Sequence, residues 1–328
     1  MEQLWGSVAY RYTPQSTERR GQILHPFAIP CMRGVLALNV TRGCSHACAY
    51  CYCRAYPEAP LPGQLPVYEN LPARLEAELA RMRRLPRAVS LCTASDPFQP
   101  FPEVLSVTYR AADLLLEQGI TVTFLTKGWI PDEFIGLFAR YPGQVRARIG
   151  LLSLDPRYHR LFEPGTALPE ARLGNLKRLR EAGIAVGVRH DPVIPGVTDR
   201  SGNLDQLFRT LAAEGITHLD VGYLYIRHGI ARLLEDNLPA EVSRPLLRQF
   251  RGGPLAAVAA SASTQLLPAD LRVQSFFRLS LAAREHGITP LLCRCKNPDL
   301  EEATRCQASR ELAYPIPPRR IRQLSLAL

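Results

Sequence analysis

Three cysteines stand close together in the segment TRGCSHACAYCYC. Cys44, Cys48 and Cys51 have the spacing Cys-x3-Cys-x2-Cys. Thiolates are soft ligands that favour iron–sulfur clusters or zinc. Three thiolates are one fewer than a closed zinc site or an ordinary cubane cluster requires, so one metal position would stay open to a small molecule. The spacing therefore predicts an open metal centre, and the alternative is a zinc knuckle with Cys53 or His46 as fourth ligand.

A second group of cysteines lies near the C-terminus, in LCRCKNPDLEEATRC. Cys293, Cys295 and Cys306 are separated by one and then ten residues. One interpretation is a second metal site, either an auxiliary iron–sulfur cluster or zinc, with Cys31, another side chain or substrate as the fourth ligand. The other is three reduced thiols in a C-terminal segment. The nine cysteines are odd in number and clustered, which argues against a disulfide framework.

The elements that must position these residues follow a repeated pattern. Short apolar runs alternate with amphipathic segments from Val35 onward, which is typical of parallel βα units. Strands are expected at residues 35–40, 88–93, 121–126, 145–154, 184–189 and 218–225. Six such units are fewer than the eight of a closed barrel, so we predict an α/β fold with a partial (β/α)6 TIM-like barrel.

The barrel is expected to occupy one part of the chain. We predict an N-terminal extension at residues 1–33, the partial barrel at residues 34–226, and a C-terminal cap at residues 227–328 that carries the second cysteine group. Functional groups of parallel α/β folds gather where strands end. Polar residues at such positions predict one shared pocket, and they are Ser95, Asp96, Lys127, Ser153, Arg189 and Asp191.

The first cysteine group, with Tyr50 before its last member, resembles the radical S-adenosylmethionine (SAM) superfamily. The segments CTASDPFQP, FLTKG, LLSLDPRYHRLFEPGT and VRHDPVIPG resemble its spore photoproduct lyase-like branch, over about Val35 to Gly196. The resemblance implies a 4Fe-4S cluster on Cys44, Cys48 and Cys51, whose fourth iron chelates the amino and carboxylate groups of SAM. One electron then cleaves SAM to a 5′-deoxyadenosyl radical, and the protein supplies orientation and exclusion of water.

The resemblance also implies cofactor-binding residues. Lys127 matches a lysine that contacts the SAM carboxylate, and Ser153 matches a serine that contacts SAM. Ser95 and Asp96 lie on the loop that meets the methionyl amino group, although either residue could instead cap a helix. Arg189 could pair with SAM or a phosphate in a bidentate manner.

Three further residues are candidates for hydrogen transfer. The lyase places a cysteine at the end of strand two as hydrogen donor, and neighbouring tyrosines relay the hydrogen; Tyr50 and Tyr52 flank Cys51 here in the same way. Cys92 lies four residues before Asp96, where the lyase motif has three. A one-residue shift turns a strand side chain to the opposite face, so Cys92 either faces the pocket or is a buried thiol in the wall.

Composition limits the classes of protein. The chain has 328 residues, of which 46% are hydrophobic and 21% charged, a globular composition that argues against wholesale disorder. No secretory signal is visible, and no apolar run approaches the roughly 20 residues of a membrane span, so we expect a cytoplasmic protein without membrane contact. The net charge of +10 permits a nucleic-acid partner, and equally a solvated basic surface.

The leading hypothesis is a radical SAM enzyme that abstracts hydrogen from a substrate, with a DNA photoproduct as the candidate and a flavodoxin or ferredoxin as reductant. One alternative is a radical SAM enzyme with an auxiliary cluster that acts on a peptide or small metabolite. The other is a zinc-stabilised nucleic-acid-binding module without catalysis.

Overall fold

A computed structural model describes residues 4–27, 29–258 and 261–306 of the chain. Its centre is an eight-stranded sheet with the strand order β12-β9-β8-β7-β6-β5-β3-β2. All neighbouring strands are parallel except β2, which is antiparallel to β3. The strands are β2 (His25–Pro26), β3 (Leu36–Leu38), β5 (Ala88–Leu91), β6 (Thr121–Thr126), β7 (Val145–Gly150), β8 (Ala185–Val193), β9 (His218–Tyr223) and β12 (Thr289–Leu292).

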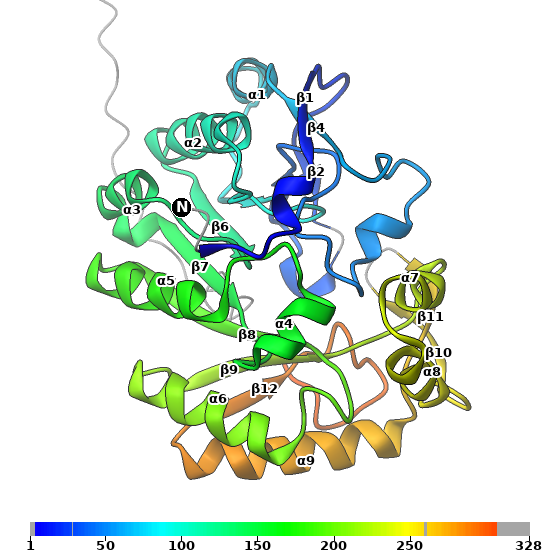
Figure 1. The fold of residues 1–328 in the computed structure, drawn as a ribbon. Helices are drawn as coiled ribbons and strands as arrows, with labels where there is room; N and C mark the ends of the chain where they lie inside the picture. Colours follow the sequence, from blue (N-terminus) through cyan, green and yellow to red (C-terminus); the bar gives the residue numbers. More distant parts are fainter. Residues whose placement is uncertain (1–3, 28, 259–260, 307–328) are drawn as a thin grey trace, which may run out of the picture.

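Helices cover the outer side of this curved sheet, where they follow one another in an arc (Figure 1). They are α1 (Leu71–Ala80), α2 (Pro102–Glu117), α3 (Asp132–Ala139), α5 (Pro169–Glu181), α6 (Ser201–Ala213) and α9 (Ala269–Glu285). Helix α2 shows why they pack there: Val104, Val107, Ala111 and Leu115 are buried at helical spacing. It ends before Gly119, whose φ of +74° is the left-handed conformation that suits glycine.

Smaller elements surround the barrel. The helix α4 (Pro156–Phe162) follows β7, and the pair α7 (Ile230–Asn237) and α8 (Ala240–Arg248) precedes a hairpin of β10 (Leu255–Val258) and β11 (Ser261–Gln265). Near the N-terminus, β1 (Thr13–Thr17) pairs in parallel with β4 (Gln64–Tyr68).

The expected α/β partial barrel is confirmed, and all six expected strands are present: β6 has the expected bounds, and the other five differ at one or both ends. The fourth strand ends at Gly150 and not at Leu154, and the fifth continues past Arg189 to Val193. The seventh parallel strand, β12, was not expected. It pairs with β9 and shows that residues beyond 227 contribute to the sheet, so the division at residues 33 and 226 stays a prediction.

No helix in the described ranges has both the length and the apolar character needed to cross a membrane.

Candidate metal and cofactor site

The loop that follows β3 carries the first cysteine group, and backbone contacts fix its course. The Ser45 amide donates to Oε1 of Gln99 at 2.7 Å, and the Gly165 amide donates to the carbonyl of His46 at 3.0 Å. The Ala49 amide donates to the carbonyl of Phe162 at 2.9 Å. The loop is therefore held against the segments that follow β5 and α4, which keeps its thiols in fixed positions.

The three thiols differ in how readily they ionise. Burial raises the pKa of Cys48 to about 12 and also raises that of Cys44. The Cys53 thiol donates a hydrogen bond to Cys51, which lowers the pKa of Cys51 to about 6. Coordination of a metal would compensate the cost of burying the thiolates of Cys44 and Cys48, so the donor set suits a metal centre.

The spacing of the sulfur atoms distinguishes a cluster from a single ion. Two thiolates on one zinc ion cannot lie farther apart than about 4.6 Å, twice the Zn–S bond length. Among the described residues, one group of three metal-ligating side chains has all its ligand atoms within 4.8 Å of one another, and it does not contain Cys44, Cys48 or Cys51. The loop after β3 therefore carries no set of three ligand atoms that meets this spacing, which argues against a zinc knuckle there.

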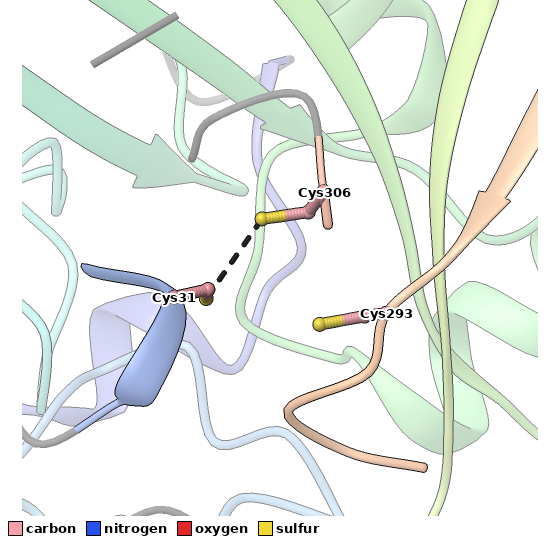
Figure 2. A group of neighbouring side chains, drawn as sticks. All are labelled: Cys31, Cys293 and Cys306. Atoms are coloured by element: carbon pink, nitrogen blue, oxygen red, sulfur yellow. Dashed lines mark hydrogen bonds between the residues drawn. The ribbon is translucent and has the colours of Figure 1, made fainter. Parts of the chain in front are cut away.

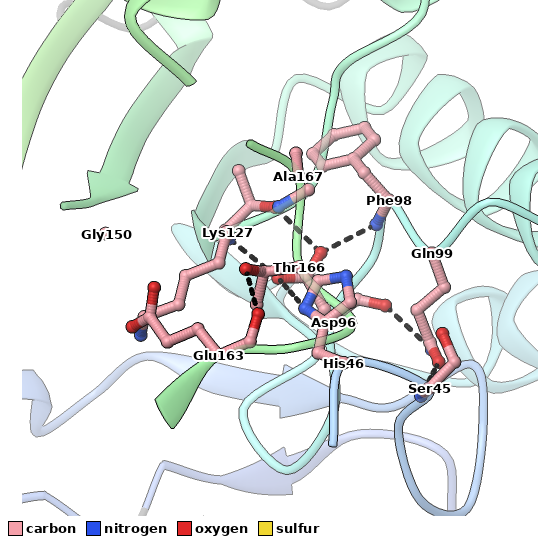
Figure 3. Close-up of polar contacts among 12 residues, drawn as sticks. Ser45, His46, Asp96, Phe98, Gln99, Lys127, Gly150, Glu163, Thr166 and Ala167 are labelled. Atoms are coloured by element: carbon pink, nitrogen blue, oxygen red, sulfur yellow. Dashed lines mark hydrogen bonds and ion pairs between the residues drawn. The ribbon is translucent and has the colours of Figure 1, made fainter. Parts of the chain in front are cut away.

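Asp96 joins the ends of β5 and β6 (Figure 3). Its Oδ1 accepts hydrogen bonds from the Phe98 amide at 2.9 Å and the Thr126 hydroxyl at 2.7 Å, and its Oδ2 accepts from the Lys127 amide at 2.9 Å. Nδ1 of His46 lies 3.5 Å from Oδ2. Because these donors occupy the carboxylate, Asp96 holds the backbone of Lys127 in place.

Lys127 directly follows β6, and its side chain runs along Gly150 at the end of β7 (Figure 3). A Cβ atom added at Gly150 would lie 2.9 Å from Cγ and 3.2 Å from Nζ of the lysine. Nζ also lies 5.7 Å from the centre of the Tyr50 ring, which belongs to the cysteine loop. Because Gly150 has no side chain, the side chain of Lys127 can extend past it toward the cysteine loop.

Two charged residues that the sequence analysis did not single out lie behind Tyr50. The Tyr50 hydroxyl donates to Oε1 of Glu163, and Nη1 of Arg172 donates to Oε2 at 2.6 Å. Both charged residues are 1% exposed. Arg172 also donates to the carbonyls of Gly150 at 3.0 Å and Ala167 at 2.8 Å. Glu163 lies in the quoted segment LLSLDPRYHRLFEPGT, but its partners become visible only in the fold.

The two candidate serines lie in different surroundings. Ser95 contacts the Cys92 thiol and shares its loop. The Ser153 hydroxyl donates to Oδ1 of Asn203 and accepts from the Asp155 amide at 3.0 Å, so it connects the end of β7 to α6. Their contacts with SAM stay predictions.

Cys92 follows β5 directly and has a φ of +55°. Its amide donates to the carbonyl of Leu38 in β3 at 2.7 Å. The residue is 4% exposed within the main apolar core, and burial raises the pKa of its thiol to about 12. The structure thus places a neutral thiol between two strands, and its role as a hydrogen donor stays a prediction.

An aromatic and cationic group lies beside the cysteine loop. The Tyr52 hydroxyl donates to the carbonyl of Thr93 at 2.8 Å, and the rings of Tyr52 and Tyr56 lie 5.8 Å apart edge to face. The guanidinium of Arg227 lies 5.3 Å from the centre of the first ring and 6.0 Å from that of the second. Such a set can stack on a planar ring.

Arg189 contacts a different set of residues from Lys127. Its Nε donates to Oδ2 of Asp191 at 2.7 Å, and Nζ of Lys296 donates to the same carboxylate at 2.6 Å. Burial raises the pKa of Asp191, but the two cations outweigh it and bring the value down to about 2. The charge of Arg189 also acts on the thiols of Cys293 and Cys306, so the structure groups Arg189 with the second set of cysteines.

Comparison with solved structures shows the fold. A spore photoproduct lyase variant superposes with a TM-score of 0.66 at 16% identity, covering 86% of this chain and 83% of that one. The lyase complexed with dinucleoside spore photoproduct gives a TM-score of 0.65 at 17% identity over the same shares.

Curated relatives resemble part of the chain. An uncharacterized protein of Mycobacterium tuberculosis is 34% identical over 199 residues, which is 58% of this chain and 58% of the relative. A radical SAM Nα-GlyT isomerase of Pseudomonas phage M6 is 26% identical over 218 residues, 65% of this chain and 43% of the relative. The chain therefore spans 58% of the length of the mycobacterial relative and 43% of that of the phage relative.

The sequence model of the radical SAM superfamily matches residues 38–207, which is about half of the chain and includes the three cysteines of the loop after β3. This chain belongs to the radical SAM superfamily.

Proposed function

We propose that the protein holds a 4Fe-4S cluster on Cys44, Cys48 and Cys51, binds SAM beside it, and abstracts hydrogen from a substrate. The observation that carries the proposal is the placement of these thiols on a fixed loop after β3, with the amine of Lys127 5.7 Å from the Tyr50 ring of the same loop. When bound, the cluster supplies the electron that cleaves SAM, and SAM supplies the 5′-deoxyadenosyl radical.

The chain's own residues have distinct tasks in this proposal. Lys127 offers a point charge to the SAM carboxylate, and Gly150 leaves room for its side chain. Asp96 acts as a positioning residue, because it accepts the Lys127 amide and fixes the ends of β5 and β6. Glu163 and Arg172 support the loop from behind through Tyr50, in a buried region from which water is excluded.

The first experiment tests the cofactors. After anaerobic reconstitution with iron and sulfide, the protein is reduced with dithionite in the presence of SAM, and 5′-deoxyadenosine is quantified. We expect the nucleoside to form, and Lys127→Ala to raise the KM for SAM by roughly tenfold or more. Lys177→Ala is the matched control, because Lys177 is exposed on α5. A protein that binds zinc on the first loop and forms no 5′-deoxyadenosine overturns the proposal.

We propose a nucleic-acid base as the substrate class. Tyr52, Tyr56 and Arg227 beside the cysteine loop form a set that can stack on a base, and the net charge of +10 favours a polyanion. The similarity of fold to a lyase complexed with dinucleoside spore photoproduct makes a DNA photoproduct the first candidate. Cys92 and Tyr52 are the candidates for returning hydrogen, since the Tyr52 hydroxyl contacts the carbonyl of the residue that follows Cys92.

The second experiment tests this substrate class. Irradiated and undamaged DNA are incubated with the reconstituted protein, SAM and a flavodoxin or ferredoxin as reductant, and the products are analysed by mass spectrometry. We expect chemical change of the irradiated DNA alone, and weaker DNA binding by Arg227→Ala than by Arg232→Ala, whose side chain on α7 is 86% exposed. If neither DNA changes while 5′-deoxyadenosine still forms, the proposal for the substrate is wrong and the proposal for the cofactors stands.

A further inference from the structure

Three cysteines far apart in the sequence meet at one point (Figure 2). Cys31 lies in the short helical turn Pro30–Met32 between β2 and β3, Cys293 directly follows β12, and Cys306 ends the described chain. Their sulfur atoms all lie within 4.8 Å of one another. The sulfurs of Cys31 and Cys306 are 3.8 Å apart.

These distances fit thiolates that share one metal ion. With a metal–sulfur bond of about 2.3 Å, the edge of a tetrahedron of thiolates is about 3.8 Å. In a cubane cluster each cysteine binds a different iron, so the thiolates are held apart by the width of the cube. The 3.8 Å between Cys31 and Cys306 equals the tetrahedral edge and leaves no room for a cube between them.

A fourth sulfur lies next to the three. The Cys295 thiol contacts the Cys293 thiol, and Cys31 contacts it through both its side chain and its backbone. Cys295 lies outside the group of three whose ligand atoms are within 4.8 Å of one another, and it is the fourth thiol that can complete the ligand set of a closed structural site.

The C-terminal ligands are held by a buried arginine of α9. Arg272, which is 1% exposed, donates to Oδ1 of Asn297 at 3.2 Å and to both carboxylate oxygens of Asp299. Asn297 in turn donates to the carbonyl of Cys293 through its side-chain amide at 3.0 Å and its backbone amide at 3.1 Å. This chain of contacts orients the ligand loop before a metal arrives.

The surrounding charge suits an anionic metal centre. Four thiolates on a divalent ion leave a net negative charge, and the guanidinium of Arg189 acts on both Cys293 and Cys306. Lys296, on the same loop, and Arg189 are joined through Asp191.

We propose that Cys31, Cys293, Cys295 and Cys306 bind one zinc ion in a closed tetrahedral site that joins the two edges of the barrel sheet. The strand order places β2 at one edge and β12 at the other, and the ligands come from the segments that follow these two strands. The site is structural, since four protein ligands leave no open position. Binding releases the thiol protons and involves no change of oxidation state.

The test uses the full chain with Cys44, Cys48 and Cys51 all replaced by alanine, which removes the ligands of the first centre. We expect one zinc and no iron per chain by elemental analysis. Exchange for cobalt should give the intense visible bands of a tetrahedral thiolate site. Retention of iron and sulfide in this variant, one iron without sulfide, or no metal with a disulfide found by mass spectrometry would each overturn the proposal.

A second set of variants separates this site from the first. In the otherwise intact chain, Cys31→Ser and Cys306→Ser should lose zinc and melt at lower temperature while retaining the iron of the first loop after reconstitution. Cys92→Ser is the matched control, because it removes a buried thiol outside the group and should keep the zinc. Zinc retained in both Cys31→Ser and Cys306→Ser would contradict the assignment, whatever the outcome of the SAM experiment.

Discussion

The hydroxyl of Tyr50 donates a hydrogen bond to the carboxylate of Glu163, which the guanidinium of Arg172 holds from the other side. The contact joins the cysteine loop to the segment after α4. Glu163 and Arg172 are both 1% exposed, so each depends on the other to offset the cost of burying its charge.

Replacing Glu163 by glutamine should therefore destabilise the fold more than removing the tyrosine hydroxyl. Glu163→Gln leaves the Arg172 cation buried without its counter-charge, and we expect a loss of about 3–5 kcal/mol in the free energy of unfolding. Tyr50→Phe keeps the ion pair and should cost about 1–3 kcal/mol. Urea denaturation measures both, and Glu133→Gln on the exposed face of α3 is the control. Equal losses for Glu163→Gln and Glu133→Gln would show that the ion pair is not needed.

Gly150→Ala should weaken SAM binding without unfolding the protein. The added methyl group would lie 2.9 Å from Cγ of Lys127, so the flexible lysine must take another path away from the loop. We expect the dissociation constant for SAM, measured anaerobically by calorimetry, to rise as it does in Lys127→Ala. Gly136→Ala in α3 is the control, because no atom lies within 4 Å of its added methyl group. SAM binding of wild-type strength in Gly150→Ala would argue against Lys127 as a ligand.

Asp96→Asn should loosen the ends of β5 and β6. The carboxylate accepts hydrogen bonds from three protein donors. In asparagine one carboxylate oxygen is replaced by an NH₂ group, which is itself a donor and cannot accept such a hydrogen bond. We expect a loss of about 1–3 kcal/mol in the free energy of unfolding. The matched control is Asp132→Asn, whose side chain is 93% exposed and should change stability by less than about 1 kcal/mol. Two equal denaturation midpoints would contradict the positioning role.

Acid should destabilise the fold through His190. Burial lowers the pKa of this histidine from 6.5 to about 4. The unfolded chain therefore binds more protons between these pH values, and the free energy of unfolding falls as pH decreases from 6.5 to 4, by about 3 kcal/mol at most. Burial lowers the pKa of His46 to about 4 as well, so both histidines contribute in the same direction.

His190→Gln tests this contribution. Glutamine retains a donor for the carbonyl of Leu151, which lies 3.2 Å from Nδ1 of His190, but it does not titrate. Melting temperatures across pH 4 to 7 should fall less steeply in this variant, with His228→Gln at an exposed position as the control. A pH slope identical to that of the wild-type protein would refute the assignment.

The barrel strands were predictable because buried parallel strands leave continuous apolar runs, as in TVTFLT at Thr121–Thr126, which is β6. Strand β12 was not predicted, because its four residues carry no more pattern than a loop. Its place in the sheet depends on pairing with β9, about seventy residues earlier, and such pairing leaves no local signal.

For the site too, residues that are close in the sequence could be predicted, whereas those that only the fold brings together could not. Cys44, Cys48 and Cys51, the proposed cluster ligands, could be singled out from the sequence because all three lie in one loop. Glu163 and Arg172 were missed because an isolated acidic or basic residue reads as solvent-exposed until the fold shows what surrounds it. Cys31 was one candidate partner of the second cysteine group in the sequence, but only the contact across the sheet selects it.

Cys31 and Cys306 touch although 275 positions separate them. A ribosome must therefore release nearly the whole described chain before these sulfurs can meet, so the final joining of the two sheet edges follows synthesis of the barrel. Until β12 has been synthesised, β9 is an unpaired edge of the sheet. Pairing of this edge with a strand of another nascent chain then competes with pairing to β12.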